Sequence, residues 1–190
     1  MRIVFCGVGA LGSTAAVSCR NLDATPRFVD FDRVESKNVL AQAFVKQSIG
    51  KNKAEALKLQ FSNFYGLKAE AMGVRLAEQN AAAVLSDADL IVDCFDNAKG
   101  RRLVSAFARE HERPLVHAAL SADGTFGLVR WEERFSADEE DAEGQATCEG
   151  GEHLPMIALV SATLARTIQD FVKTGQKADY LVSLNGVRTT

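Results

Sequence analysis

The sequence predicts a doubly wound α/β fold in which a mainly parallel sheet carries an antiparallel extension. Three observations support this fold class. Short apolar runs alternate with stretches of helical spacing, a glycine-rich turn follows the first apolar run, and two apolar runs around residue 120 follow one another without a helix between them. Alternating strands and helices favour a parallel sheet, whereas a direct return favours antiparallel pairing.

The first half of the chain contains the expected parallel units. Residues 2 to 6, RIVFC, form a continuous apolar run with β-branched side chains, and GVGALGS leads from it into a helical stretch through Arg20. A second strand is expected around Pro26 to Phe31, and residues 51 to 64 have helical spacing. The alternating run LKAEAMGV then predicts a third strand.

The second half begins with LIVDCF, which predicts the most buried strand. GRRLVSAFAREHE predicts a helix that stops before Pro114, and PLVHAAL predicts the next strand. GTFGLVRW follows after a short turn, so we expect it to pair antiparallel. Pro155 begins a long apolar helix that ends near Gly175, and YLVSLNGV predicts one last short strand.

Length and composition favour a single domain over residues 1 to 190. A chain of 190 residues and 20.5 kDa can bury a substantial core, and no internal repeat or low-complexity linker divides it. Residues 132 to 147 carry seven acidic side chains and one basic side chain, with little apolar content. We therefore expect a solvated, mobile acidic loop in this stretch.

Charge and cysteine content argue against several classes of protein. With 22 basic and 25 acidic residues the net charge is -3, which provides no basic surface for nucleic acid. The apolar stretches are too short for a membrane span, and glycines interrupt the N-terminal run, unlike a signal peptide. The four cysteines, Cys6, Cys19, Cys94 and Cys148, form no CxxC pair. Neither zinc nor a disulfide is expected, and a cytoplasmic location fits best.

The glycine-rich turn predicts a nucleotide site. Gly7, Gly9 and Gly12 fit the pattern G-x-G-x-x-G directly after a strand, where missing side chains let phosphate approach backbone amides and a helix N-terminus. Asp30 follows at the end of the second strand, in a position suited to ribose hydroxyls. The arrangement is Rossmann-like, and by itself it fits NAD, FAD or ATP.

Further polar residues favour ATP among these nucleotides. Asn38, Gln42 and Lys53 follow the second strand, and Lys53 can neutralise charge on a triphosphate. Asp96 follows the buried strand LIVDCF and projects from the carboxyl edge of the sheet, where an acidic group can hold magnesium. Asp93 is the competing acid, although its place within the strand favours a buried structural role.

Five stretches carry a family resemblance when they are taken in order. They are GVGALGS, DFDRVESKNVLAQ, IGKNKAEAL, DCFDN and TCEGGEHLPMIALVSATLA. Together they resemble the ThiF/MoeB-type adenylyltransferases, the superfamily that includes the ubiquitin-activating enzymes. The resemblance implies MgATP-dependent adenylation of the C-terminal carboxylate of a small ubiquitin-like or sulfur-carrier protein ending in glycine, with release of pyrophosphate. It also implies a homodimer or a heterodimer.

The resemblance implies a set of site residues within these motifs. The residues expected to bind nucleotide are Gly7, Gly9, Gly12, Asp30, Asp32, Asn38, Gln42, Lys53, Asp96 and Asn97. Among them Lys53 would meet the phosphates and Asp96 would bind magnesium near the reacting carboxylate, so both are catalytic candidates. Cys148 is the third, because it matches the position where some members carry a cysteine that links covalently to the carrier protein.

Departures from the family pattern keep other functions open. Family members usually carry an arginine where this chain has Ala41, and the sequence begins at the first strand without the N-terminal helix of many members. One alternative is therefore a non-catalytic nucleotide-binding subunit or scaffold of such a system. Another is an NAD-dependent oxidoreductase, which would leave Lys53 and Asp96 without a task. His117, within PLVHAAL, is assigned no functional role.

Overall fold

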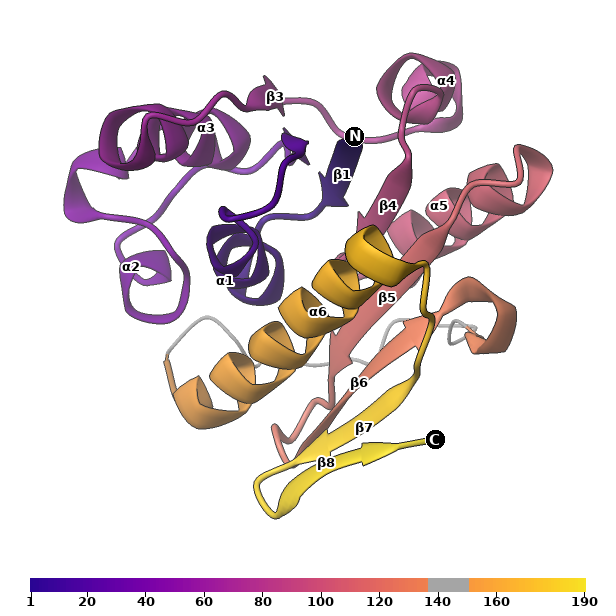
Figure 1. Cartoon of the computed structure of the whole chain (residues 1–190). Coiled ribbons are helices and arrows are strands. Elements are labelled where there is room, and N and C mark those ends of the chain that lie inside the picture. The colour runs from indigo at the N-terminus through magenta and orange to yellow at the C-terminus, as the bar shows by residue number, and fades with distance from the viewer. Residues whose placement is uncertain (137–150) are drawn as a thin grey trace.

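The protein is described here by a computed structural model, which covers residues 1–136 and 151–190 (Figure 1). The strands within these residues are β1 Arg2–Cys6, β2 Thr25–Val29, β3 Glu70–Met72, β4 Leu90–Asp93, β5 Leu115–Leu120, β6 Phe126–Trp131, β7 Tyr180–Ser183 and β8 Gly186–Thr189. The α-helices are α1 Ala10–Ser18, α2 Asn38–Ala41, α3 Lys53–Tyr65, α4 Glu78–Leu85, α5 Ala98–Glu110 and α6 Leu154–Thr174, and two 3-10 helices are η1 Lys46–Ser48 and η2 Glu132–Arg134.

All these strands belong to one sheet with the order β3-β2-β1-β4-β5-β6-β7-β8. The pairs from β3 to β5 are parallel, with Ile3 of β1 beside both Pro26 of β2 and Leu90 of β4, whereas the pairs from β5 to β8 are antiparallel. The chain lays down β1, β2 and β3 toward one edge and then places β4 on the other side of β1. The strand order therefore reverses between β1 and β4, and open α/β sheets bind ligands outside the carboxyl ends of strands at such a point.

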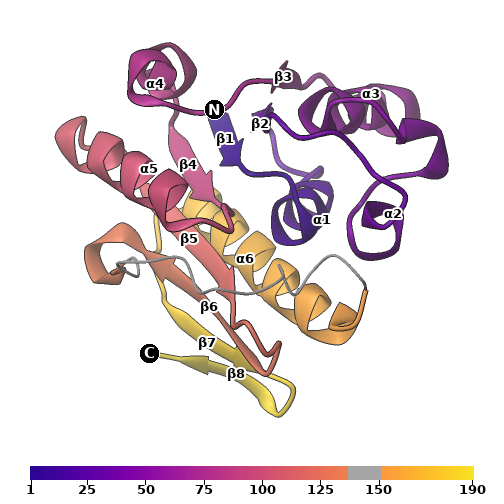
Figure 2. The same cartoon turned by 180° about the vertical axis from the view of Figure 1, so that it is seen from behind.

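Helices cover both faces of the parallel part of the sheet (Figures 1 and 2). α1, α3 and α6 pack on one face, where Phe5, Phe28 and Leu164 belong to the larger buried apolar cluster. α4 and α5 pack on the opposite face, where Val4 and Ile91 belong to a second cluster. The parallel strands are therefore buried on both sides, which explains their nearly continuous apolar sequences.

Local signals set the ends of the longer helices. α3 begins after Asn52, whose side chain accepts a backbone N–H of the first turn at 3.1 Å, and ends at Gly66, which is left-handed with φ 65°. α6 has Pro155 in its first turn and ends at Gly175, where φ is 72°. The proline and glycine signals seen in the sequence therefore mark real helix boundaries.

The predicted fold class is confirmed, with differences of detail that include the tail and the acidic stretch. The prediction of one last strand was wrong, because the tail forms a hairpin in which Ser183 of β7 pairs with Gly186 of β8 across a two-residue turn. The expected acidic loop over 132 to 147 begins with η2, in which Glu132 is buried, while residues 137–147 lie outside the described part of the chain. No helix within the described ranges has the length and apolar character needed to cross a membrane.

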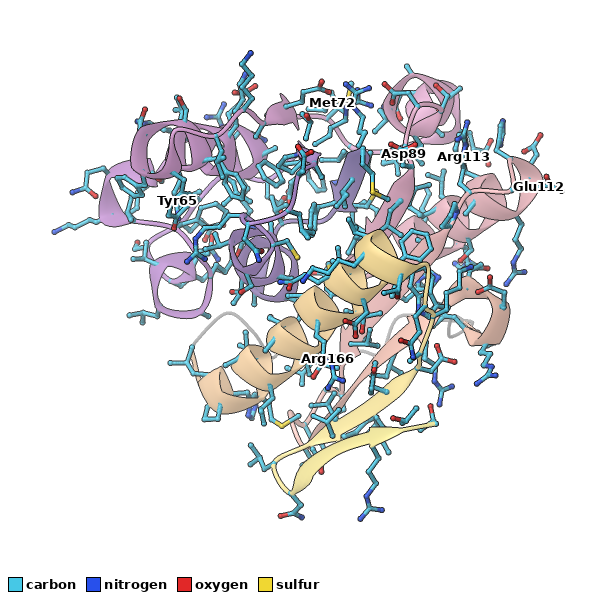
Figure 3. All side chains as sticks on the ribbon, in the orientation of Figure 1. Tyr65, Met72, Asp89, Glu112, Arg113 and Arg166 are labelled. Atoms are coloured by element: carbon cyan, nitrogen blue, oxygen red, sulfur yellow. The ribbon has the colours of Figure 1, made fainter. Side chains whose placement is uncertain are left out.

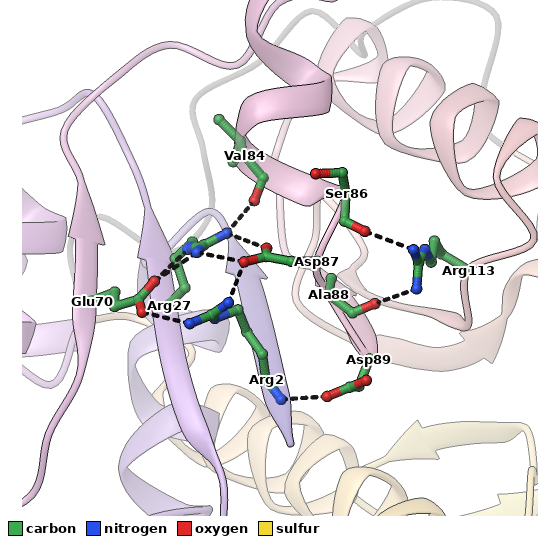
Figure 4. A network of polar contacts seen from close by, with 9 residues as sticks. All are labelled: Arg2, Arg27, Glu70, Val84, Ser86, Asp87, Ala88, Asp89 and Arg113. Atoms are coloured by element: carbon green, nitrogen blue, oxygen red, sulfur yellow. Dashed lines mark hydrogen bonds and ion pairs between the residues drawn. The ribbon is translucent and has the colours of Figure 1, made fainter.

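A network of ion pairs closes the amino ends of the parallel strands (Figure 4). Arg27 contacts Glu70 and Asp87, each at 2.7 Å, and Arg2 pairs with the same two carboxylates. The hydrogen bond from Arg27 holds the pKa of Asp87 below its usual range. Arg113 donates to two main-chain carbonyls just before β4 and lies at this same end of the molecule (Figure 3). These ion pairs connect β1, β2 and β3 to the segment that leads into β4.

Candidate nucleotide-binding site

The glycine turn joins β1 to α1 at the point where the strand order reverses. Gly7 has φ 84°, a conformation that glycine adopts without strain, and its N–H donates to the Val29 carbonyl of β2 at 2.9 Å. A Cβ on Gly12 would lie 2.0 Å from the Gly7 carbonyl oxygen, whereas a Cβ on Gly9 would meet nothing within 4 Å. Gly12 therefore allows α1 to pack against the turn, and Gly9 leaves open space beside the start of the helix.

Asp30 connects the end of β2 to this turn. Its carboxylate accepts the backbone N–H groups of Val8 and Asp32, both at 2.9 Å. Burial raises the pKa of Asp30, although the two backbone hydrogen bonds and nearby Lys53 act in the opposite direction. Lys53, at the start of α3, is buried, and its Nζ lies 3.3 Å from the half-exposed carboxylate of Asp32. A cation thus lies next to the Asp32 carboxylate and near Asp30, the carboxylate that holds the glycine turn.

The segment after β2 places two further predicted residues. Asn38 is buried, and its side-chain oxygen accepts the Glu35 N–H at 2.8 Å, so it stabilises the turn that begins α2. Gln42 follows α2, and its buried Oε1 has no hydrogen-bond partner within the described residues. A buried acceptor without a partner is destabilising unless water or a ligand satisfies it. The geometry therefore makes Gln42 a stronger candidate for ligand contact than Asn38.

Ser13 links the glycine turn to this segment, although it was not among the predicted site residues. Its buried hydroxyl donates to the Gly9 carbonyl at 2.6 Å and accepts the Ala43 N–H at 3.0 Å. The available signal was the hydroxyl directly after Gly12, one turn into the helix. Ala41 is 5% exposed and packs in the apolar core, so this position contributes no cation.

Asp96 lies in the turn from β4 to α5, across the strand-order reversal from the glycine turn. Its side chain is exposed, and the neighbouring Asn97 caps α5 by accepting the Gly100 N–H at 2.8 Å. The turns after β1 and β4 touch, because a Cβ on Gly7 would lie 2.9 Å from the Cys94 carbonyl oxygen. Asp96 and Asn97 are therefore carried to the same edge as the glycine turn.

A chain of charged groups lies beneath the turn that carries Asp96. Asp93, the last residue of β4, is fully buried; its Oδ1 accepts the Phe95 N–H at 3.0 Å, and its Oδ2 lies 2.8 Å from His117 Nδ1 and 3.0 Å from an Arg101 nitrogen. Burial acts to raise the pKa of Asp93, but Arg101 and His117 outweigh it and the pKa is lowered. Asp93 is thus a charged carboxylate that shapes the turn.

One predicted site residue remains, together with a histidine and a cysteine that were not among the predicted site residues. Cys148 lies outside the described residues. His153, at the start of α6, lies against the turn between β5 and β6, where a Cβ on Gly124 would meet its ring at 2.4 Å. Burial raises the pKa of Cys19 to about 12, so this thiol is protonated at neutral pH.

The donor set fits a magnesium nucleotide. Across residues 1–136 and 151–190 no group of three or more His, Cys, Asp or Glu side chains could hold a metal by itself. Mg²⁺ in nucleotide sites is typically held by one or two carboxylates together with the phosphates of the substrate, and Asp96 supplies such a carboxylate. The N–H groups of Gly7 and Val8 are already bonded within the protein, so the backbone amides at the start of α1 are the donors left for phosphate.

A doubly wound sheet with a glycine turn at its strand-order reversal defines a Rossmann-like protein. Within this class the chain belongs to the ThiF family, whose model matches residues 1–187. It is 27% identical over 174 residues to the adenylyltransferase and sulfurtransferase UBA4 of Meyerozyma guilliermondii, an alignment that covers 87% of this chain and 38% of the relative. It is 35% identical over 94 residues to the sulfur carrier protein adenylyltransferase of Thermus thermophilus, covering 48% of this chain and 35% of the relative. Each alignment spans little more than a third of the curated relative.

Solved structures show the same fold at low sequence identity. E. coli MccB, solved with ATP, has a TM-score of 0.78 and 14% identity, and the match covers 100% of this chain and 63% of that one. PaaA has a TM-score of 0.77 and 15% identity, with 100% and 62% covered. At this level of identity the likeness concerns the arrangement of the backbone.

Proposed function

We propose that the protein catalyses ATP-dependent adenylation of the C-terminal carboxylate of a ubiquitin-like or sulfur-carrier protein ending in glycine. The main support is that a ThiF-family chain brings the glycine turn, Lys53 and Asp96 to the same edge of the sheet, where the strand order reverses. Relatives named adenylyltransferases, including a sulfur carrier protein adenylyltransferase, support the same activity. The low net charge of -3 supports a protein partner over nucleic acid.

Each predicted residue has a task in this proposal. In this proposal the amides at the start of α1 receive phosphate, with Gly9 leaving room for it, and Asp30 would hold the ribose with Asp32 beside it. Lys53 neutralises phosphate charge, and Asn38 and Gln42 complete the contacts from the segment after β2. Asp96, beside Asn97, would hold Mg²⁺, which supplies charge neutralisation to the phosphates when it is bound.

The chemistry requires positive charge and orientation rather than a general base. A carboxylate oxygen of the carrier protein attacks the α-phosphorus of ATP, the bond from that phosphorus to the bridging oxygen of the β-phosphate breaks, and pyrophosphate leaves. Both reactants are anions, so Lys53 and the backbone amides lower the barrier by offsetting their repulsion. Cys148 would then be a thiol able to take the activated acyl group, with release of AMP.

Calorimetric titration of the full chain with ATP and magnesium, and separately with NAD, tests the nucleotide site. We expect ATP to bind and NAD to give no signal, and we expect Lys53→Ala and Asp96→Asn to weaken ATP binding about tenfold or more, as loss of a charge-assisted contact does. The exposed Lys51 and Asp23 provide matched control variants, Lys51→Ala and Asp23→Asn, which should bind as the unchanged chain does.

Pyrophosphate exchange into ATP in the presence of small proteins ending in glycine tests the reaction itself. Exchange that depends on the carrier and disappears in Lys53→Ala supports adenylation. Binding of ATP without exchange for any carrier would instead favour the non-catalytic subunit. The buried Ala41 supports this alternative, because it contributes no cation. Binding of NAD in place of ATP would favour the oxidoreductase.

Dimerisation and a cytoplasmic location belong to the same proposal. Exposed apolar side chains on α3 include Leu59 and Phe64, at 42% and 61% exposure, which a second subunit would cover. Sedimentation of the purified chain over a range of concentrations would establish whether it self-associates.

A further inference from the structure

We propose that His117, held between Asp93 and Glu132, is a positioning residue for the turn that carries Asp96. It acts through Asp93 rather than by touching nucleotide, and its importance for catalysis rests on the proposed adenylation. The inference assigns a role to three residues, on β4, β5 and η2, that the nucleotide site itself does not use.

The placement of His117 follows from sheet register. Asp93 and His117 are direct partners across the parallel pair of β4 and β5, so both side chains project to the same face, toward α5. His117 and Asp93 are fully buried. His117 Nδ1 lies 2.8 Å from Asp93 Oδ2, and on the far side Nε2 lies 2.5 Å from Glu132 Oε2.

These distances require a proton beyond those of a neutral imidazole and two carboxylates. Neutral imidazole has one N–H donor and one lone pair, so one carboxylate would face a lone pair at hydrogen-bonding distance. An additional proton on the ring, or shared between Nε2 and Glu132, removes this repulsion. Burial acts to lower the pKa of His117, but its hydrogen bonds to the Asp93 and Glu132 carboxylates outweigh burial, and the pKa is raised.

The charged and aromatic groups around the ring come from every element packed against it. Arg101 of α5 contacts Asp93, while Ser105 and Arg109 of α5 contact Glu132 at 3.0 Å and 2.5 Å. The Phe135 ring stacks on His117 with centroids 3.8 Å apart and an interplanar angle of 11°. Cys6 and Cys94 lie near Asp93, and their pKa values are raised, with burial the largest cause, so neither thiol adds charge. The imidazole is thus fixed on both edges and on one face.

Asp93 transmits this fixation to the turn. Its Oδ2 accepts hydrogen bonds from His117 Nδ1 and an Arg101 nitrogen. Its Oδ1 accepts the Phe95 N–H at 3.0 Å. That bond shapes the turn one residue before Asp96. The Phe95 ring in turn packs beside α5, because a Cβ on Gly100 would lie 2.8 Å from it. A change at Glu132 therefore reaches Asp96 through His117, Asp93 and the Phe95 amide.

The test compares two adjacent glutamates of η2. Glu132→Gln keeps the shape of the side chain but removes the charge facing His117, whereas Glu133→Gln removes an exposed charge paired with Lys177 and is the matched control. NMR spectra of the full chain without nucleotide follow the His117 ring and the Phe95 and Asn97 amides as a function of pH. The second readout is the Mg²⁺ concentration needed for half-maximal ATP binding.

We expect Glu132→Gln to move the His117 titration to lower pH and to shift the Phe95 and Asn97 amides. The Mg²⁺ requirement should rise about tenfold or more, the usual scale for losing support behind a metal-binding side chain. Glu133→Gln should alter none of these. A second variant, His117→Asn, keeps a donor toward Asp93 without titrating, so the turn amides should lose their pH response.

Two results would overturn the proposal. One is a Glu132→Gln protein whose turn amides and Mg²⁺ requirement match those of the unchanged chain. The other is a His117 ring that titrates at or below its ordinary pKa. If the unchanged chain binds no ATP, the proposed function fails, and the nucleotide-free amide shifts still decide whether His117 positions the turn.

Discussion

The two ends of the parallel strands treat polar groups in opposite ways. At the amino ends Arg2, Arg27, Glu70 and Asp87 pair among themselves. At the carboxyl ends the chain leaves an exposed carboxylate on Asp96, open space at Gly9 and an acceptor on Gln42 without a partner in the described residues. The paired charges at the amino ends stabilise the sheet, although Arg2 Nε and Arg113 Nε are buried there without a partner in the described residues. The open groups at the carboxyl ends can receive a ligand.

The largest expected effects separate two glycines of the same turn. Gly12→Ala places a methyl group against the Gly7 carbonyl and should lower the free energy of unfolding by about 3 kcal/mol, as overpacking does. Gly9→Ala meets open space and should leave stability nearly unchanged while weakening ATP binding. Denaturant unfolding and calorimetry check the pair. Equal stability losses in both variants would contradict the assignment of Gly12 to helix packing and Gly9 to ligand space.

Substitutions at the amino ends of the parallel strands should change the stability of the protein but not its affinity for ATP. Arg27→Met removes the buried cation shared by Glu70 and Asp87 and should destabilise the protein by about 2 kcal/mol, less than a fully buried pair because both carboxylates remain partly hydrated. Affinity for ATP, measured under conditions where the variant is folded, should not change. Lys58→Met, at an exposed pair on α3, serves as the control. A loss of ATP affinity in Arg27→Met alone would show that the two ends are coupled.

The pH dependence of stability should distinguish the buried group of His117, Asp93 and Glu132 from the polar groups at both ends of the parallel strands. The pKa of His117 is raised, so its contribution is full below its unfolded pKa of about 6.5 and is lost as pH rises through the folded value. The pKa values of Asp93 and Glu132 are lowered, so their contributions are lost only as pH falls below about 4. The stability difference between the unchanged chain and Glu132→Gln should therefore shrink from pH 6 toward pH 9. Thermal unfolding across this range measures it, and a difference that grows with pH would contradict the assignment.

The smallest effect is expected on the outer face of α6. Arg166 lies 3.5 Å from Asp170 with 71% of its side chain exposed, and Figure 3 shows it on the ribbon of that helix. Arg166→Ala should change the free energy of unfolding by no more than about 0.5 kcal/mol, since exposed pairs are screened by solvent. Urea unfolding provides the measurement. A loss above 1 kcal/mol would indicate a contact beyond this pair.

Much of the fold could be predicted because strong local signals agreed with the tertiary structure. Continuous apolar runs marked the buried parallel strands, and Pro155 and Gly175 marked the ends of α6. The tail was harder, since a two-residue turn at 184 to 185 lacks the usual Asn-Gly sequence and the eight-residue run resembled one strand. The start of the acidic stretch was missed because the burial of Glu132 depends on His117, fifteen positions earlier.

The site shows the same division between local and distant information. The glycine turn and Asp30 follow a fixed spacing, and the sequence was enough to nominate them. The roles of Ser13 and His117 depend on partners that only the folded chain brings near, Ala43 in one case and Glu132 in the other. Periodicity reports which face a residue occupies but does not report the polar group it meets there.

The Ser13 hydroxyl has a consequence for how the site moves. The Ser13 hydroxyl donates to the Gly9 carbonyl and accepts the Ala43 N–H, so this one group connects the glycine turn to the segment after α2. Neither segment can move away alone without breaking a partly buried hydrogen bond. The Ala43 amide is consequently a natural reporter, whose rate of exchange with solvent deuterium registers any loosening of the glycine turn many residues away.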